Sequence, residues 1–159
     1  MARANTILGD GTFRITPHLW YQTFILSAEV QAGVFVPVAF SLLPDKTKNS
    51  YDEMFKMVKD CLNVRGLQLS PENFMSDFET NIRKSFHKYF KDVTIKGCHF
   101  HYAKALWTKV VNNGFKIAYT ACSLFGGFVR ACIGLAYVPL ERMAEGVQNL
   151  KIIARTLEA

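Results

Sequence analysis

Acidic residues are scarce in this sequence, and this scarcity leaves it with a clear excess of positive charge. Only 13 Asp and Glu stand against 19 Lys and Arg in 159 residues, which gives a formal net charge of +6. A basic chain favours an anionic partner, and nucleic acid is the first candidate. Half of the residues are apolar, so the composition excludes a disordered chain and indicates one globular domain.

Cysteines are also few, and long apolar runs are missing. The four cysteines are widely spaced and no apolar leader opens the chain, so we expect an intracellular protein with reduced thiols. The most apolar stretch, Ile117 to Val129, is shorter than the roughly 20 residues that span a bilayer. It predicts a buried helix, and we expect no membrane partner.

Three runs with β-strand character come first, at residues 6–13, 21–30 and 34–43. The third run is apolar on both faces, which predicts a central strand in the sheet. Pro37 lies within that run, and a proline cannot donate to a strand ladder, so it indicates a bulge or an edge. The two interpretations of this run remain open.

Helical patterns follow the three strands. Ser50 and Glu53 have the spacing of a capping box, and Gly66 is a stop signal for the helix that they begin. A short strand over 73–77 precedes a second amphipathic helix, and a strand over 92–98 precedes a third helix that ends at Gly114. The apolar side of this third helix is predicted to include two aromatic residues, Phe100 and Trp107.

This order of elements predicts an α/β fold, a ribonuclease H-like mixed five-stranded sheet flanked by helices. We assign residues 5–114 to this core. Residues 115–159 are predicted to form a helical extension, with breaks at Gly126-Gly127 and at Pro139.

Two carboxylates fall at notable places in this fold. Asp10 lies in the first strand run and Asp77 ends the fourth, with Glu79 two residues later. In a ribonuclease H-like sheet the first and fourth strands are neighbours, so Asp10 and Asp77 are predicted to face each other and to hold Mg²⁺ or Mn²⁺. The alternative is that Asp10 is a turn residue and Asp77 the N-cap of the next helix.

Cys98 and His101 form a Cys-x-x-His pair where a strand gives way to a helix. The pair allows three interpretations: a packed corner, support of an active site or DNA path, or metal ligation. A structural zinc ion needs four ligands, and no second half-site is visible in the sequence. We therefore expect no structural zinc.

Four blocks of the sequence, in order, carry a family resemblance: GDGTFRITPHLWYQTFILSAEV, VFVPVAFSLLPDKTKNSYDEMF, FMSDFETNIRKSF and VTIKGCHFHYAKALWTKV. They resemble successive blocks of the Mutator-like element (MULE) transposase domain, from about Asn5 to Asn113 and more weakly to Leu150. The resemblance implies DNA cleavage and strand transfer by divalent-metal phosphoryl transfer. It also implies that Asp10 and Asp77 are catalytic and that Cys98 and His101 lie near the active centre or the DNA.

The family's third catalytic residue is a glutamate beyond a helical insertion, and no residue here matches its surroundings. Glu141, Glu145 and Glu158 are available, but we expect the chain to stop before the family's glutamate, so the third carboxylate is unknown. An incomplete transposase core and an inactive, domesticated DNA- or protein-binding remnant both remain open. A nuclease that uses Asp10, Asp77 and Glu79 is a third, weaker hypothesis.

The remaining expectations concern partners and location. The Lys and Arg surface predicts DNA binding without sequence preference, because phosphate contacts carry no sequence information. The segment 115–138 is apolar almost all round, which predicts self-association. We expect the protein to be nuclear.

Overall fold

The computed structural model describes residues 4–157, which form two compact units that meet in the chain at Cys98 and His99. The first unit contains all five strands, β1 (Thr6–Thr12), β2 (Gln22–Gln31), β3 (Val34–Leu43), β4 (Asn73–Ser76) and β5 (Thr94–Gly97). They form one sheet in the order β3-β2-β1-β4-β5. The predicted mixed five-stranded sheet is confirmed and is compatible with a ribonuclease H-like fold. The predicted domain boundary after residue 114 stays a prediction.

The strand pairing changes from antiparallel to parallel at β1. β1 and β3 each pair with β2 in antiparallel fashion, whereas β4 is parallel to β1 and β5 is parallel to β4. The prediction of a central third strand is wrong, because β3 lies at the edge of the sheet. Pro37 was the better indicator, since the ladder shifts register between Leu26 and Ser27, opposite Ala39 and Pro37. An edge strand tolerates the missing donor of a proline.

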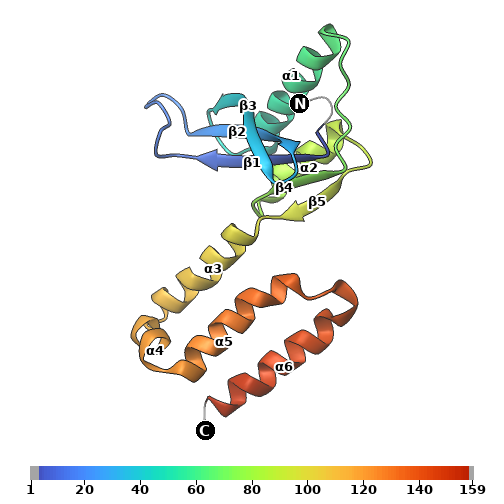
Figure 1. The fold of residues 1–159 in the computed structure, drawn as a ribbon. Helices are drawn as coiled ribbons and strands as arrows, with labels where there is room; N and C mark the ends of the chain where they lie inside the picture. Colours follow the sequence, from blue (N-terminus) through green and yellow to red (C-terminus); the bar gives the residue numbers. More distant parts are fainter. Residues whose placement is uncertain (1–3, 158–159) are drawn as a thin grey trace. The chain divides into compact units, whose positions relative to one another are not determined.

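Two helices, α1 (Lys48–Val64) and α2 (Thr80–Tyr89), cover one face of the sheet (Figure 1). Aromatic rings dominate the core between these helices and the sheet. The ring of Phe74 in β4 stacks on Phe86 of α2 with centroids 3.7 Å apart, and Phe55 of α1 meets Phe86 edge-on at 5.2 Å. Gly9 of β1 passes beneath these rings, and a Cβ atom there would lie 2.8 Å from the Phe74 ring. The close approach of β1 to the core therefore requires glycine at this position.

The N-terminus of α1 is built differently from the prediction. The N-cap is Thr47, whose side chain accepts a hydrogen bond from the Ser50 backbone N–H. The Ser50 hydroxyl donates to Asp45 at 2.6 Å, and this bond is the main reason that the pKa of Asp45 is lowered. The predicted capping box of Ser50 and Glu53 is wrong, because Ser50 already lies inside the helix. The predicted ends of two helices are confirmed, since Gly66 follows α1 and Gly114 follows α3.

A charged cluster ties α1 to α2. Asp52 Oδ2 lies 2.7 Å from Nζ of Lys48 in the same helix and 2.7 Å from Nζ of Lys88 in α2. The two lysines, Lys48 first, hold the pKa of Asp52 well below its usual range. The Asp52 side chain is only 13% exposed, so this cluster is less screened by solvent than an ordinary surface pair.

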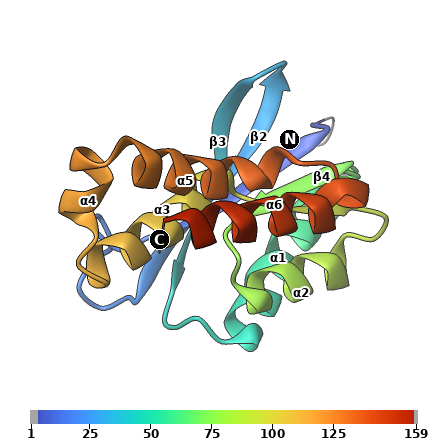
Figure 2. The same ribbon diagram turned by 90° about the horizontal axis from the view of Figure 1, so that it is seen from below.

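The second unit is entirely helical. It contains α3 (His99–Asn112), α4 (Lys116–Ala121), α5 (Ser123–Gly134) and α6 (Met143–Thr156), with the short 3₁₀ turns η1 (Leu135–Tyr137) and η2 (Leu140–Arg142) between α5 and α6. Figure 2 shows α5 and α6 side by side, in agreement with their contacts. The Tyr102 hydroxyl of α3 donates to the Cys132 carbonyl of α5 at 2.8 Å.

Three helical predictions in this unit are wrong and one is confirmed. The stretch from Ile117 to Val129 is not one buried helix, because it is divided between α4 and α5, in which only Gly126 and Val129 are buried. α5 runs straight through Gly126-Gly127, and the break falls at Cys122. Phe100 is exposed rather than part of an apolar core stripe, whereas the predicted break at Pro139 is confirmed. Trp107 is half-buried and meets Tyr119 edge-on at 5.0 Å. Among residues 4–157 there is no helix with both the length and the apolar character needed to cross a bilayer.

The Asp52 cluster leads to a prediction about stability. Asp52→Asn should lower the free energy of unfolding at pH 7 by about 1 kcal/mol, because it removes a charged acceptor shared by two lysines. The folded pKa of Asp52 is lowered, so this stabilisation is present above the ordinary carboxylate pKa of about 4 and is lost as the pH falls below it. Urea unfolding at pH 7 and pH 3 measures the difference.

Asp60→Asn is the matched control. Asp60 pairs only with Lys56 in the same helix, and both side chains are more than half exposed. This substitution should leave the urea midpoint unchanged at either pH. An equal effect of both substitutions at pH 7 would show that the link between α1 and α2 contributes nothing specific.

Candidate functional site

The register of β1 and β4 relates the positions of Asp10 and Asp77 in the sheet. Leu8 pairs with Met75 and Gly9 with Ser76 in the parallel ladder, so one further step brings Asp10 level with Asp77. Neighbouring strands lie about 4.8 Å apart. Asp10 lies inside β1, so the interpretation of Asp10 as a turn residue is wrong. The two aspartates occupy adjacent positions at the carboxyl edge of these parallel strands.

Alternation along β1 decides which way Asp10 points. Ile7 and Gly9 are buried in the core that α1 and α2 cover, whereas Asp10 is exposed. Successive residues of a strand point to opposite faces. Asp10 therefore lies on the face opposite the two helices, where water and ligands have access within this unit.

Asp77 is positioned by the turn that follows β4. Its Oδ1 accepts a hydrogen bond from the Glu79 backbone N–H at 3.0 Å, and its carbonyl oxygen accepts one from the Ser76 hydroxyl at 3.0 Å. Asp77 closes the turn before α2, but the alternative prediction that it is the N-cap of this helix is wrong, because the N-cap is Glu79. An ionised carboxylate has about four lone-pair sites, so one such bond leaves capacity for a cation.

The same turn is held from the side of β5. Phe78 follows Asp77, and its ring lies over Gly97, where a Cβ atom would be only 2.5 Å from the ring. Any other residue at 97 would push the ring, and the Asp77 turn with it, out of place. The glycine in β5 therefore helps to position Asp77 from across the sheet.

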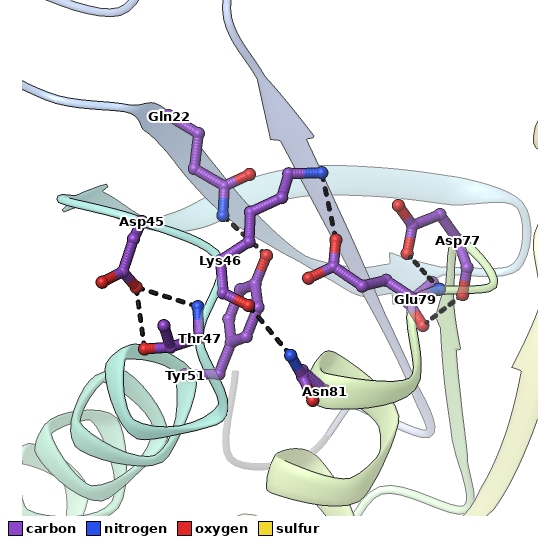
Figure 3. A network of polar contacts seen from close by, with 9 residues as sticks. Gln22, Asp45, Lys46, Thr47, Tyr51, Asp77, Glu79 and Asn81 are labelled. Atoms are coloured by element: carbon purple, nitrogen blue, oxygen red, sulfur yellow. Dashed lines mark hydrogen bonds and ion pairs between the residues drawn. The ribbon is translucent and has the colours of Figure 1, made fainter.

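Glu79 links the Asp77 turn to the wider polar network shown in Figure 3. Its Oε2 forms an ion pair with Lys46 Nζ at 3.1 Å. Nearby, Gln22 Nε2 donates to the hydroxyl oxygen of the fully buried Tyr51 at 2.6 Å. Burial raises the pKa of Tyr51 far above its usual value, and the negative charge of Glu79 raises it further. Glu79 therefore connects the turn after β4 to the loop before α1.

A second contact fixes the same loop. Figure 3 shows the Asn81 side chain of α2 reaching back to the Lys46 carbonyl, to which its Nδ2 donates at 3.0 Å. Lys46 also lies over the ring of Phe13, with Nζ 5.0 Å from the ring centroid. Lys46 is thus a junction between the β1–β2 loop, the loop before α1 and the turn after β4.

Sequence reasoning did not find Gln22, Lys46 or Tyr51. Gln22 and Tyr51 are 29 residues apart and Lys46 and Glu79 are 33 apart, so no local spacing reveals the contacts. The one usable signal was a glutamine at the start of an apolar strand. A buried amide needs a hydrogen-bonding partner.

Cys98 and His101 fall in different units. Cys98 follows β5, and its backbone N–H donates to the Ser76 carbonyl at 2.8 Å, which extends the β4–β5 ladder. His101 lies in the first turn of α3, where the ring of Phe100 meets it edge-on at 5.5 Å. Their support role near DNA or an active centre stays a prediction.

The other glutamates considered for the third carboxylate, Glu141, Glu145 and Glu158, all follow the first unit in the sequence. Glu141 is exposed in η2, and Glu145 of α6 forms a two-pronged ion pair with Arg142 at 3.0 Å through both oxygens. Glu158 lies outside the described residues. Within residues 4–157, no group of three or more His, Cys, Asp and Glu side chains is arranged to hold a metal ion.

Comparison with known proteins gives a family match for this chain. A search of curated proteins gives no match. The family described as the MULE transposase domain matches residues 6–105. That range includes both aspartates, the Cys98 and His101 pair and all five strands, and it spans more than half of the chain. This chain therefore belongs to the MULE transposase domain family.

Proposed function

We propose that this chain is the core of a DNA transposase that uses Asp10 and Asp77 for divalent-metal phosphoryl transfer. Family membership supports a transposase-like function that acts on DNA. The observation that supports the finer proposal is the β1–β4 register, which pairs Gly9 with Ser76 and, continued by one step, would make the two aspartates neighbours at the carboxyl edge of the sheet. Ligands of open α/β sheets bind at this edge.

The two aspartates suit a hard divalent cation. Two carboxylates at adjacent strand positions repel each other, and a cation between them removes that repulsion. Oxygen ligands are those that Mg²⁺ and Mn²⁺ prefer. Bound there, the ion would polarise a phosphodiester and lower the pKa of an attacking water or hydroxyl. The turn of Asp77 and the strand position of Asp10 hold the carboxylates in place without it.

A second function is a DNA- or protein-binding domain without catalysis. The observation that favours it is the lack of a third acidic ligand beside Asp10 and Asp77 within the described residues. Two aspartates alone bind Mg²⁺ weakly, because affinity rises with the number of protein oxygens. The third carboxylate remains unassigned, with Glu79, Glu141 and Glu145 as the residues to test.

Surface properties of the chain support two further parts of the proposal. The net charge of +6 favours contact with DNA phosphates, with an affinity that falls steeply as salt rises. The segment 115–138 exposes large apolar side chains, including Ile117 at 78% and Leu124 at 70%. Exposed apolar residues of this size favour association with another copy of the chain.

The metal proposal predicts a weak Mn²⁺ site at the two aspartates. In an Mn²⁺ titration, backbone amide signals of β1 and of the turn after β4 should broaden first, because paramagnetic relaxation falls steeply with distance. Asp10→Asn and Asp77→Asn should each weaken this broadening about tenfold, since each removes one of two carboxylate ligands. Asp60→Asn is the control, because Asp60 is an exposed aspartate of α1. Broadening that persists in the double variant would refute the site.

The two functions differ in their effect on supercoiled plasmid. The binding function predicts that the purified chain binds plasmid weakly and leaves it uncut with Mg²⁺ or Mn²⁺. Nicking that is lost in both Asp10→Asn and Asp77→Asn would instead establish catalysis. The variants Glu79→Gln, Glu141→Gln and Glu145→Gln would then identify the third carboxylate by a loss of about 10² or more in rate.

Self-association should depend on the apolar segment. Ile117→Lys with Leu124→Lys should shift the chain toward monomer, because two charges interrupt the exposed apolar surface. Sedimentation velocity at several protein concentrations measures the shift. Thr120→Lys, an exposed polar position of the same segment, is the matched control and should leave the distribution unchanged. A wild-type chain that is monomeric at all concentrations would contradict the proposal.

A further inference from the structure

The loop between β1 and β2, residues 13–21, exposes an unusual number of large apolar side chains. Those with more than a third of their surface exposed are Phe13, Ile15, Leu19, Trp20 and Tyr21, ranging from 41% for Trp20 to 90% for Leu19. Single exposed apolar residues are common, but five within nine positions form a patch, and such patches mark interaction sites. We call residues 13–21 the aromatic loop.

The aromatic loop has a defined internal structure. Backbone bonds from Thr16 to Phe13 at 3.2 Å and from Trp20 to Pro17 at 2.9 Å close two successive turns. The Thr16 hydroxyl donates to the Thr12 carbonyl at 2.8 Å and accepts from the Thr23 backbone N–H at 2.8 Å. The side chain of Thr16 thus closes the base of the loop, which lets the loop hold its rings in defined positions.

Two of the rings are fixed by direct contacts. Phe13 and Tyr21 meet edge-on with centroids 5.6 Å apart, and the Tyr21 backbone N–H donates to the Leu43 carbonyl at 2.9 Å. Lys46 places its ammonium 5.0 Å from the centroid of the Phe13 ring. About half of each ring remains accessible. The result is a small platform of aromatic surface with a cation at its side.

The charge of the aromatic loop points to an anionic occupant. No Asp or Glu occurs from Gly11 to Ala28, whereas Arg14 and His18 lie in the loop itself. Lys46 of the adjoining loop places a further ammonium beside Phe13, while also pairing with Glu79. Aromatic rings alternating with basic groups suit stacked nucleobases between charged phosphates. An apolar protein partner alone would not require this excess of basic over acidic side chains.

The position of the loop relates it to the two aspartates. The loop begins directly after β1, whose last residues include Asp10, and so extends from the carboxyl edge of that strand (Figure 1). β4 ends at the same edge, where Asp77 follows it. DNA bound at the aspartates therefore has this aromatic surface within reach.

We propose that the aromatic loop binds unpaired nucleobases of DNA by stacking on Phe13 and Tyr21, next to the edge that carries Asp10 and Asp77. The choice of DNA rests on the proposed function. Stacking on an aromatic side chain accepts any base, since every base has a π face. The loop would hold strand ends or splayed nucleotides beside the scissile phosphate without reading their sequence.

The test compares two single-stranded probes of equal length, a fluorescent dT oligonucleotide and an abasic oligonucleotide with the same phosphates. Anisotropy titrations of the full chain are made in EDTA, so that metal binding plays no part. The chain should bind dT at least about fivefold more tightly than the abasic probe, since each stacked base contributes about 1–3 kcal/mol. Phe13→Leu and Tyr21→Leu should each reduce this preference about fivefold and leave abasic binding unchanged.

Leu19→Ala is the matched control, because Leu19 is the most exposed apolar residue of the loop and has no π face. It should leave both affinities unchanged, and circular dichroism checks that each variant is folded. Three results would overturn the inference: equal binding of the two probes, an equal loss for both probes in Phe13→Leu, or a loss of dT binding in Leu19→Ala. The last would indicate a general apolar surface that suits a protein partner.

The outcomes also separate this inference from the proposed function. Equal affinity for the abasic and dT probes would contradict the stacking role of the loop. It would still be compatible with a transposase domain that binds DNA. A preference for dT that persists in Asp10→Asn would support the stacking role. If no Mn²⁺ site is found in the same protein, the metal proposal is contradicted while the stacking role stands. If neither probe binds, both the proposal of a DNA partner and the proposed role of the aromatic loop are contradicted.

Discussion

The parallel pairing of β1 with β4 is the constraint on which the rest of the first unit depends. It joins a strand from the N-terminal antiparallel half of the sheet to one that follows α1, some 60 residues later in the chain. The pairing is held by the core beneath it, where Phe74 of β4 stacks on Phe86 of α2. Gly9 lets β1 lie close under that ring. The parallel ladder pairs Gly9 with Ser76, so Asp10 and Asp77 are the next residues along the two strands.

Around this edge, each loop is held by a contact to another loop. Lys46 connects the loop before α1 to Glu79 of the turn after β4 and to Phe13 of the aromatic loop. Phe78 in that turn rests on Gly97 of β5. These contacts limit the movement of Asp77 and of the aromatic rings relative to the sheet. Preorganised side chains lose less entropy when a charged ligand binds, which would favour the proposed phosphoryl transfer at this edge.

The two units differ in how they bury apolar surface. In the first, aromatic rings from β2, β4, α1 and α2 fill one core. In the second, only Gly126 and Val129 are buried among the described helical positions, although the sequence there is strongly apolar. A helical unit with so little buried surface has few contacts to stabilise it alone. The proposed association with a further copy of the chain would bury part of this apolar surface.

The sequence alone determined the order of elements, the edge signal at Pro37, the helix ends at Gly66 and Gly114, and the family. These follow from local periodicity, from backbone chemistry and from short blocks read in order. Tertiary structure decided the edge position of β3, the Thr47 cap and the uninterrupted helix through Gly126-Gly127. It also decided the partners of Glu79, Tyr51 and Phe13, because those contacts join residues that no local spacing relates. Burial and pairing across the fold outweigh local preference at such positions.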